Sequence, residues 1–244
     1  MYSDFLIPLL LLIVAFLYSS VGHGGASGYL AVLSLFSIAP TEMKSTSLIL
    51  NIIVSLLAFY HYYRAGYFDW RLFAFFAITS VPFSFLGSNI PISDELYKKL
   101  LGIILVFPTI KLMGISPIAN GNEIKPPKLI ISLLVGAIIG FLSGMLGIGG
   151  GILLSPLILL MGWAGMKQTA AISALFIFVN SMAGLSGLYL NGINLNSNMY
   201  IWIIVALIGG YAGSFFGSKK FDNRLLKYLL AFVLSIASLK LIFS

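Results

Sequence analysis

Two glycine-rich runs carry the residues best suited to chemistry in this chain. They read VGHGGASG at residues 21–28 and LGIGGGI at residues 146–152, and each interrupts a long apolar segment. A helix that begins after Gly25 or Gly150 presents unpaired backbone N–H groups and the positive end of its dipole, which together bind anions without a charged side chain. We therefore predict a small-anion site built from Gly22, His23, Gly24, Gly25, Ser27, Gly147, Gly149, Gly150 and Gly151.

Close helix packing is the alternative explanation for these glycines. Gly24 and Gly28 have the four-residue spacing of a small-residue packing motif. Packing alone would explain a single run. The two runs, however, lie at matching places, with Gly147 falling 125 positions after Gly22. Paired interrupted segments in two halves of a chain point to a transporter binding site.

Hydroxyl and amide side chains form a second set of candidate ligands. Ser47, Asn51 and Ser55 recur every four residues, so they share one face of a helix. The second half repeats this stripe, with an asparagine beside it: Thr169, Ser173, Ser181 and Asn180. Such groups can donate hydrogen bonds to an oxyanion, or they can join one helix to another. We add to the predicted substrate-binding residues Ser47, Asn51 and Ser173.

His23 is the one titratable side chain clearly inside an apolar segment, and the second run has Ile148 at its position. A histidine there could donate to an anion, sense pH or carry a proton. Alternatively, it stays neutral and bonds a backbone carbonyl that the glycines set free. All seven Asp and Glu residues fall in loops or at segment ends. We therefore expect no catalytic residues, no metal site and no cofactor.

The composition places the chain in a lipid bilayer. Apolar residues make up 59% and charged residues 9%, whereas a soluble domain has about half apolar and about a quarter charged residues. The net charge of +7 comes from Lys and Arg between the apolar segments, as in cytoplasmic loops, and does not indicate nucleic acid. The expected partners are a small anionic substrate and the lipid bilayer, and a homo-oligomer is left open.

Aromatic residues gather at the end of one apolar segment: Tyr60, Tyr62, Tyr63, Tyr67 and Trp70. Tyrosine and tryptophan are enriched where a span meets the lipid headgroups, so this cluster predicts an interfacial belt. An aromatic cage for a cation is the alternative. His61 lies among these tyrosines, and we expect it at the interface as well.

The apolar segments predict an all-helical membrane protein with two similar halves. Ten can be marked: 5–20, 25–38, 45–63, 71–89, 96–113, 129–144, 150–163, 169–190, 199–217 and 223–243. Offsets of 125 to 129 positions match residues of the two halves, such as Ser47 with Ser173, which indicates an internal duplication. In each half a glycine-broken pair of short helices precedes three transmembrane helices. We expect repeat 1 at residues 1–113, a linker at 114–128 and repeat 2 at 129–244.

The basic residues favour inverted topology for the two repeats. If each broken pair enters and leaves on the same side, each repeat crosses the membrane an odd number of times. With the N-terminus outside, ten of the 14 Lys and Arg lie inside, and those outside are Lys44, Lys98, Lys99 and Lys240. Counting each pair as one crossing gives at best nine against five. We predict inverted repeats in the cell (inner) membrane, with the N-terminus and the C-terminus outside.

The second glycine run and its flanks resemble the motif of the sulfite exporter TauE/SafE family. The resemblance rests on LSGMLGIGGGILLSPL at residues 142–157, on YSSVGHGGASGY at 18–29 and on KSTSL at 44–48. The second copy of the last segment, AISA at 171–174, departs from the family because it lacks the threonine. The resemblance covers essentially the whole chain and implies a multi-pass transporter of sulfur-containing or organic anions.

These features predict a secondary transporter of small sulfur-containing or organic anions, such as sulfite or a sulfonate. It would work by alternating access around a fixed site near the bilayer midplane. Two alternatives stay open: a passive anion channel, and an intramembrane enzyme acting on a lipid-linked or sulfur substrate. Flux saturation and counter-transport would separate a carrier from a channel, and product formation would reveal an enzyme.

Overall fold

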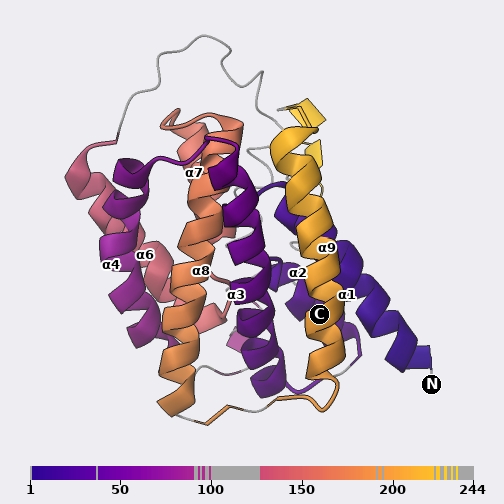
Figure 1. Cartoon of the computed structure of the whole chain (residues 1–244). Helices are drawn as coiled ribbons and strands as arrows, with labels where there is room; N and C mark the ends of the chain where they lie inside the picture. Colours follow the sequence, from indigo (N-terminus) through magenta and orange to yellow (C-terminus); the bar gives the residue numbers. More distant parts are fainter. Residues whose placement is uncertain are drawn as a thin grey trace.

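The computed structural model of the chain is a bundle of α-helices (Figure 1). It describes residues 2–36, 38–90, 127–190, 192–193 and 195–222, together with residues 93, 95, 96, 99, 224, 225, 228, 229, 232 and 235. The helices with defined bounds are α1 (Tyr2–Ser20), α2 (Ala26–Leu35), α3 (Pro40–Arg64), α4 (Trp70–Ser88), α6 (Leu129–Leu146), α7 (Gly151–Leu160), α8 (Met166–Leu190) and α9 (Met199–Lys219). Most of the expected linker and of the fifth and tenth apolar segments lies outside the described residues.

Five of these helices are long and apolar enough to cross a membrane, namely α3, α4, α6, α8 and α9. Their surfaces expose large apolar side chains such as Ile78, Ile130 and Ile208, as contact with lipid requires. In contrast, α2 and α7 have ten residues each. Ten residues give about 15 Å of helix, which is half the thickness of the hydrocarbon core. The described part of the chain is therefore a multi-pass membrane protein.

The glycine runs end and restart helices where the sequence predicts it. α1 ends at Ser20 and α2 begins after Gly25, while α6 ends before Gly147 and α7 begins after Gly150. The expectation that both members of each broken pair are short is wrong for α1 and α6, which reach 19 and 18 residues. α6 continues through Met145 and Leu146, because Gly147 adopts the left-handed conformation (φ 70°) that closes a helix and its N–H bonds the Ser143 carbonyl.

Packing contacts fix the relative directions of the helices. Three glycines of α6 face carbonyl groups of α4 in the same order along both helices: Gly136 with Phe76, Gly140 with Ser80, and Gly144 with Ser84. α9 packs on α1 in the same parallel way: Gly209 with Leu12, Gly213 with Phe16, and Gly217 with Ser20. The absent side chains let these backbones approach closely, as is usual between membrane helices.

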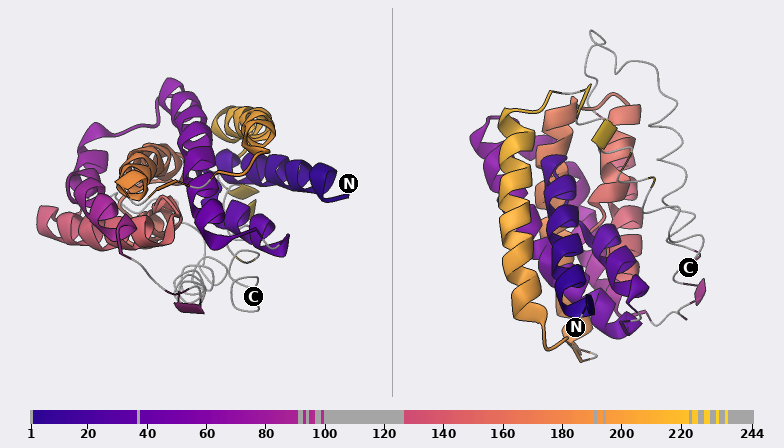
Figure 2. Two further views of the ribbon diagram at one scale, coloured as in Figure 1. Left: turned by 90° about the horizontal axis from the view of Figure 1, so that it is seen from below. Right: turned by 90° about the vertical axis from the view of Figure 1, so that its right-hand side faces the viewer.

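The two long helices α3 and α8 cross at the centre in opposite directions, since Leu48 faces Gly184 and Asn51 faces Ser181. α1, α3 and α9 consequently run one way, and α4, α6 and α8 run the other (Figures 1 and 2). Loop 65–69, between α3 and α4, marks one end of the bundle. Residues 195–198, before α9, mark the opposite end (Figure 1).

α1 and α2 form a hairpin that returns to the end from which it started. Gly28 of α2 packs against Val14 and Tyr18 of α1, and the Tyr18 hydroxyl lies 2.8 Å from Ser27 Oγ. α1 starts toward the 195–198 end, and α3 also starts at that end (Figure 1). The counterpart, α6 with α7, leads into α8 at the 65–69 end (Figure 1).

One member of the expected aromatic belt, Tyr62, and the neighbouring His61 are buried in the protein instead. Tyr62 is fully buried and donates a hydrogen bond to the Ser20 carbonyl at 2.6 Å. His61 packs between α3 and α9, with Nδ1 lying 2.8 Å from Ser214 Oγ. The helical repeat turns Tyr62 and His61 toward neighbouring helices, while Tyr60, Tyr63 and Trp70 are exposed as a belt requires.

Candidate anion-binding site

Asn51, in the middle of α3, lies between the two glycine runs. A Cβ added to Gly24 would overlap the Asn51 amide, and one added to Gly149 would lie 2.7 Å from Asn51 Nδ2. The side chain is fully buried. Its Oδ1 accepts from the Ala26 backbone N–H at 2.9 Å, and its Nδ2 donates to Ser181 Oγ at 3.4 Å. One amide therefore joins the start of α2 to the second run and to α8.

The helix starts beside Asn51 present backbone N–H groups, as the sequence predicts. In α2, Ala26 N–H is bonded to Asn51, but the N–H groups of Ser27 and Gly28 make no bond to a described residue. In α7, the N–H groups of Gly151 and Ile152 likewise make no hydrogen bond to a described residue. All four residues are buried. Buried N–H groups are rarely left unpaired, so these two turns suit a ligand that accepts hydrogen bonds.

His23 connects the first run to the start of α7. Its Nε2 lies 3.1 Å from the Gly151 carbonyl and 3.1 Å from Ser155 Oγ. Ser155 Oγ is in turn 2.6 Å from Ser173 Oγ on α8. A carbonyl can only accept, so Nε2 carries the proton in the neutral ring. Nδ1 is buried and makes no hydrogen bond to a described residue, which leaves it as a bare acceptor.

We expect His23→Gln and His23→Leu to separate the two nitrogens of this ring. A glutamine amide can reach the place of Nε2 and keep the bond to the Gly151 carbonyl, whereas leucine leaves that carbonyl unpaired. The leucine variant should unfold more easily by about 1–3 kcal/mol, and the glutamine variant by clearly less. Thermal unfolding of the two purified proteins measures the difference. Equal losses would mean that Nε2 does not support the fold.

The remaining predicted residues are engaged mainly with protein atoms. Ser47 Oγ donates to carbonyls, with Lys44 O at 3.0 Å and Gly147 O at 3.2 Å. Ser27 Oγ bonds the Tyr18 hydroxyl. Gly22 packs on the backbone of Ala170. Of the second polar stripe, Ser181 meets Asn51, whereas Asn180 bonds Ser80 Oγ and the Phe176 carbonyl, away from the runs.

Three further hydroxyls belong to this neighbourhood and were missed at the level of sequence. Ser155 bonds His23. Tyr29 and Ser143 carry buried hydroxyls without a partner among the described residues. Tyr29 lies against Gly25, and Ser143 lies against Gly150. Ser155 could have been found, because it falls one helical turn after Gly151 and thus points the same way.

The whole assembly is closed to solvent in this structure. His23 is 2% exposed, and Ser47, Asn51 and Ser173 are 0% exposed. A ligand could reach these groups only after helices move apart. Among the described residues, no cluster of three or more His, Asp or Glu side chains could hold a metal ion. The polar groups at the site are backbone N–H groups, hydroxyls, one amide, one imidazole and the carbonyls of Gly147 and Gly151.

Comparison with known proteins decides the family. The profile of the sulfite exporter TauE/SafE family matches residues 7–241. The chain belongs to the TauE/SafE family. It is 35% identical over 234 residues to the probable membrane transporter protein y4hK of Sinorhizobium fredii, covering 94% of each chain. It is also 31% identical over 214 residues to the probable membrane transporter protein MJ0441 of Methanocaldococcus jannaschii, covering 82% of this chain and 77% of that one.

Membership of the TauE/SafE family confirms the resemblance seen in the glycine motif. The family and these relatives are named as membrane transporters and not as enzymes, so the intramembrane-enzyme alternative falls away. No solved structure matches the chain. The site of this TauE/SafE protein is consequently described from its own geometry around Asn51.

Proposed function

We propose that the chain is a secondary transporter of a small sulfur-containing or organic anion, such as sulfite or a sulfonate. The observation that carries the proposal is the meeting of both glycine runs at Asn51, together with buried N–H groups, unpaired among the described residues, in the first turns of the two helices that follow these runs. Oxyanions accept several hydrogen bonds at once, and a helix start favours negative charge. The predicted ligands remain Gly22, His23, Gly24, Gly25, Ser27, Ser47, Asn51, Gly147, Gly149, Gly150, Gly151 and Ser173.

A thermal-shift screen of the purified protein tests the substrate class. Sulfite, sulfate, thiosulfate, taurine and sulfoacetate would each be titrated, with chloride as the control anion. A ligand that binds only the folded state raises the unfolding temperature with concentration, by about 2.7 kcal/mol of stability at a hundred times its Kd. We expect a saturable shift with at least one sulfur oxyanion and none with chloride. The absence of any shift would argue against the proposal.

Alternating access is the proposed mechanism, supported by the closed site and by the symmetry of the helix contacts. Exchanging α1 with α6, α2 with α7, α3 with α8, and α4 with α9 turns each main contact into another: α1–α9 into α6–α4, and α3–α9 into α8–α4. Equivalent helices run in opposite directions. This pattern is what inverted repeats produce. A site closed on both sides favours a carrier over a passive channel.

The inverted orientation makes a direct prediction about two equivalent loops. Loops 65–69 and 195–198 follow the third helix of their repeats, and the chain has no cysteine. We expect Ala65→Cys to label only from the cytoplasm and Ser197→Cys only from outside, because Arg64 and Arg71 flank the first loop. An impermeant thiol reagent applied to cells and to inverted vesicles measures this. Parallel repeats would place both cysteines on one side.

The orientation in the inner membrane, with both termini outside, belongs to the same proposal, and the oligomeric state stays a prediction.

Coupling of anion transport to protons follows from the state of the His23 ring. Since Nε2 is engaged and Nδ1 is a bare acceptor, the ring can donate to an anion through Nδ1 only when doubly protonated. A proton would then accompany the anion. His23→Gln lacks Nδ1 and should weaken anion binding more than it weakens the fold.

A further inference from the structure

Two lysines occupy matching places at opposite ends of the bundle. Lys44 lies near the start of α3, and Lys167 lies at the start of α8. Because α3 and α8 are antiparallel, Lys44 lies toward the 195–198 end and Lys167 toward the 65–69 end. Each reaches the closing carbonyls of the next span in its own repeat: Lys44 Nζ donates to Ser88 O of α4 at 3.5 Å, and Lys167 Nζ to Ser218 O of α9 at 3.3 Å.

Both ammonium groups are half-buried, and the hydrogen bonds that hold them are weak. Their distances to the carbonyls exceed the usual 2.7–3.2 Å of N–H···O bonds, and neither forms an ion pair with a described acid. The acids nearby are occupied elsewhere, since Glu42 accepts from Asn196 and Asp69 accepts from Leu72 N and Gln168. Lys167 also lies over the Tyr67 ring at 5.2 Å. A cation taken partly out of water without a counter-ion favours a nearby anion.

Lys44 also flanks the outer edge of the second glycine run, and Lys167 lies one helical turn before the residue that packs on the first run. The aliphatic stem of Lys44 packs on Gly147, the first glycine of the second run. Ala170, which aligns with Lys44 in the other repeat, packs on Gly22 through its backbone atoms, and Lys167 lies one turn before it. From Lys44 to Asn51 is seven residues of helix, about 10 Å along the axis. Along its helix, each lysine therefore lies between one end of the bundle and the polar residues at the centre.

We propose that Lys44 and Lys167 are gate lysines: each binds the anion at one face of the protein and releases it toward the glycine runs. Each ammonium leaves its carbonyl when the site opens on its side, and returns to the carbonyl once the anion has moved on. The proposal rests on the proposed function. It assigns a side to each residue: Lys44 serves the face of residues 195–198, and Lys167 serves the face of loop 65–69.

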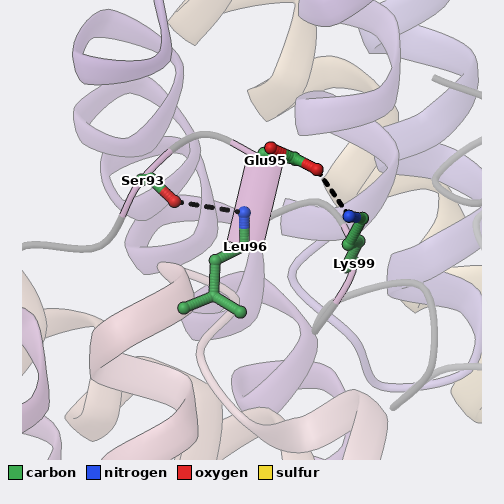
Figure 3. A network of polar contacts seen from close by, with 4 residues as sticks. All are labelled: Ser93, Glu95, Leu96 and Lys99. Carbon is green, nitrogen blue, oxygen red and sulfur yellow. Dashed lines mark hydrogen bonds and ion pairs between the residues drawn. The ribbon is translucent and has the colours of Figure 1, made fainter.

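Uptake of radiolabelled sulfite into proteoliposomes tests the assignment. Ala65→Cys or Ser197→Cys, modified from outside by an impermeant thiol reagent, would inactivate the molecules inserted in one of the two orientations. We expect Lys44→Gln to raise KM roughly tenfold for sulfite presented at the 195–198 face, with little change at the other. Lys167→Gln should do the reverse. Lys44→Arg should keep the wild-type KM, because it keeps the charge. The matched control is Lys99→Gln, since Lys99 is exposed and already paired with Glu95 in a turn where Ser93 also bonds Leu96 N (Figure 3).

Several results would overturn the gate. The lysines would be structural caps if the glutamine variants raised KM equally at both faces, or lowered only the unfolding temperature. Should Lys44→Gln fail to fold, Lys44→Met keeps the packing on Gly147 without the charge. Independently, uptake by the wild type should fall with ionic strength at both faces. Sulfite flux with no side preference in any variant defeats the gate alone, whereas a wild type that moves no sulfur anion defeats the proposed function as well.

Discussion

Replacing Gly22 by alanine is expected to abolish transport and to destabilise the protein by several kcal/mol. Gly22 has φ 78°, and a Cβ there would overlap the backbone of Ala170 on α8, including its carbonyl oxygen. The left-handed conformation alone costs about 1–2 kcal/mol for an L-residue. The overlap adds at least as much again, because backbone atoms of a central helix cannot turn aside as a side chain could.

Gly66 provides a matched control for this prediction. It has nearly the same backbone conformation, with φ 81°, but a Cβ there would meet nothing within 4 Å. Gly66→Ala should therefore cost only the strain of the left-handed conformation, about 1–2 kcal/mol, and keep its transport activity. The measurements are thermal unfolding in detergent and sulfite uptake in proteoliposomes. Similar losses in both variants would show that backbone strain, and not close approach to α8, explains Gly22.

Asn51→Asp should eliminate anion binding while leaving the fold in place. The carboxylate can still accept from Ala26 N–H, and a negative charge is favourable at the start of α2. The same charge repels an anionic substrate by about 4 kcal/mol at 4 Å in partly screened surroundings, or roughly a thousandfold in affinity. Binding of the best anion from the thermal-shift screen, measured by calorimetry, tests this expectation.

Two further variants make the result specific. Asn198→Asp adds the same charge at the exposed N-cap of α9 and should leave binding unchanged. Asn51→Leu is neutral but leaves Ala26 N–H and Ser181 without their partner, so it should destabilise the fold by about 1–3 kcal/mol. If Asn51→Leu still bound the anion tightly, the amide would serve the fold and not the substrate.

The positions of the helices were predictable because glycine and hydrophobicity act locally. The breaks after Ser20 and before Gly151 follow from consecutive glycines, and four of the five spans (α3, α4, α8 and α9) follow from the length of their apolar segments. What sequence pattern could not give is the side to which a residue turns near a helix end. Tyr62 and His61 lie in the last turn of α3, where the neighbours that bury them come from α1 and α9.

The residues of the candidate site were predictable, but the contacts among them were not. The stripe containing Asn51 indicates a polar face, yet only the crossing of α3 with α8 brings Asn51 to both glycine runs. Ser47 and Ser173 align in sequence as equals. In three dimensions they differ, because Ser47 bonds a backbone carbonyl and Ser173 bonds Ser155, whose counterpart Leu30 has no hydroxyl. Such asymmetry depends on long-range contacts that one sequence does not encode locally.

Anion binding where the two glycine runs meet Asn51 underlies every functional proposal made for this protein. Equilibrium binding of radiolabelled sulfite to the purified wild type and to Asn51→Asp tests it most directly, with unfolding temperatures recorded for both. We predict saturable binding to the wild type, competition by other sulfur oxyanions, and no measurable binding to a folded Asn51→Asp protein. Equal binding to the two proteins, or no binding of any sulfur anion to the wild type, would contradict the account.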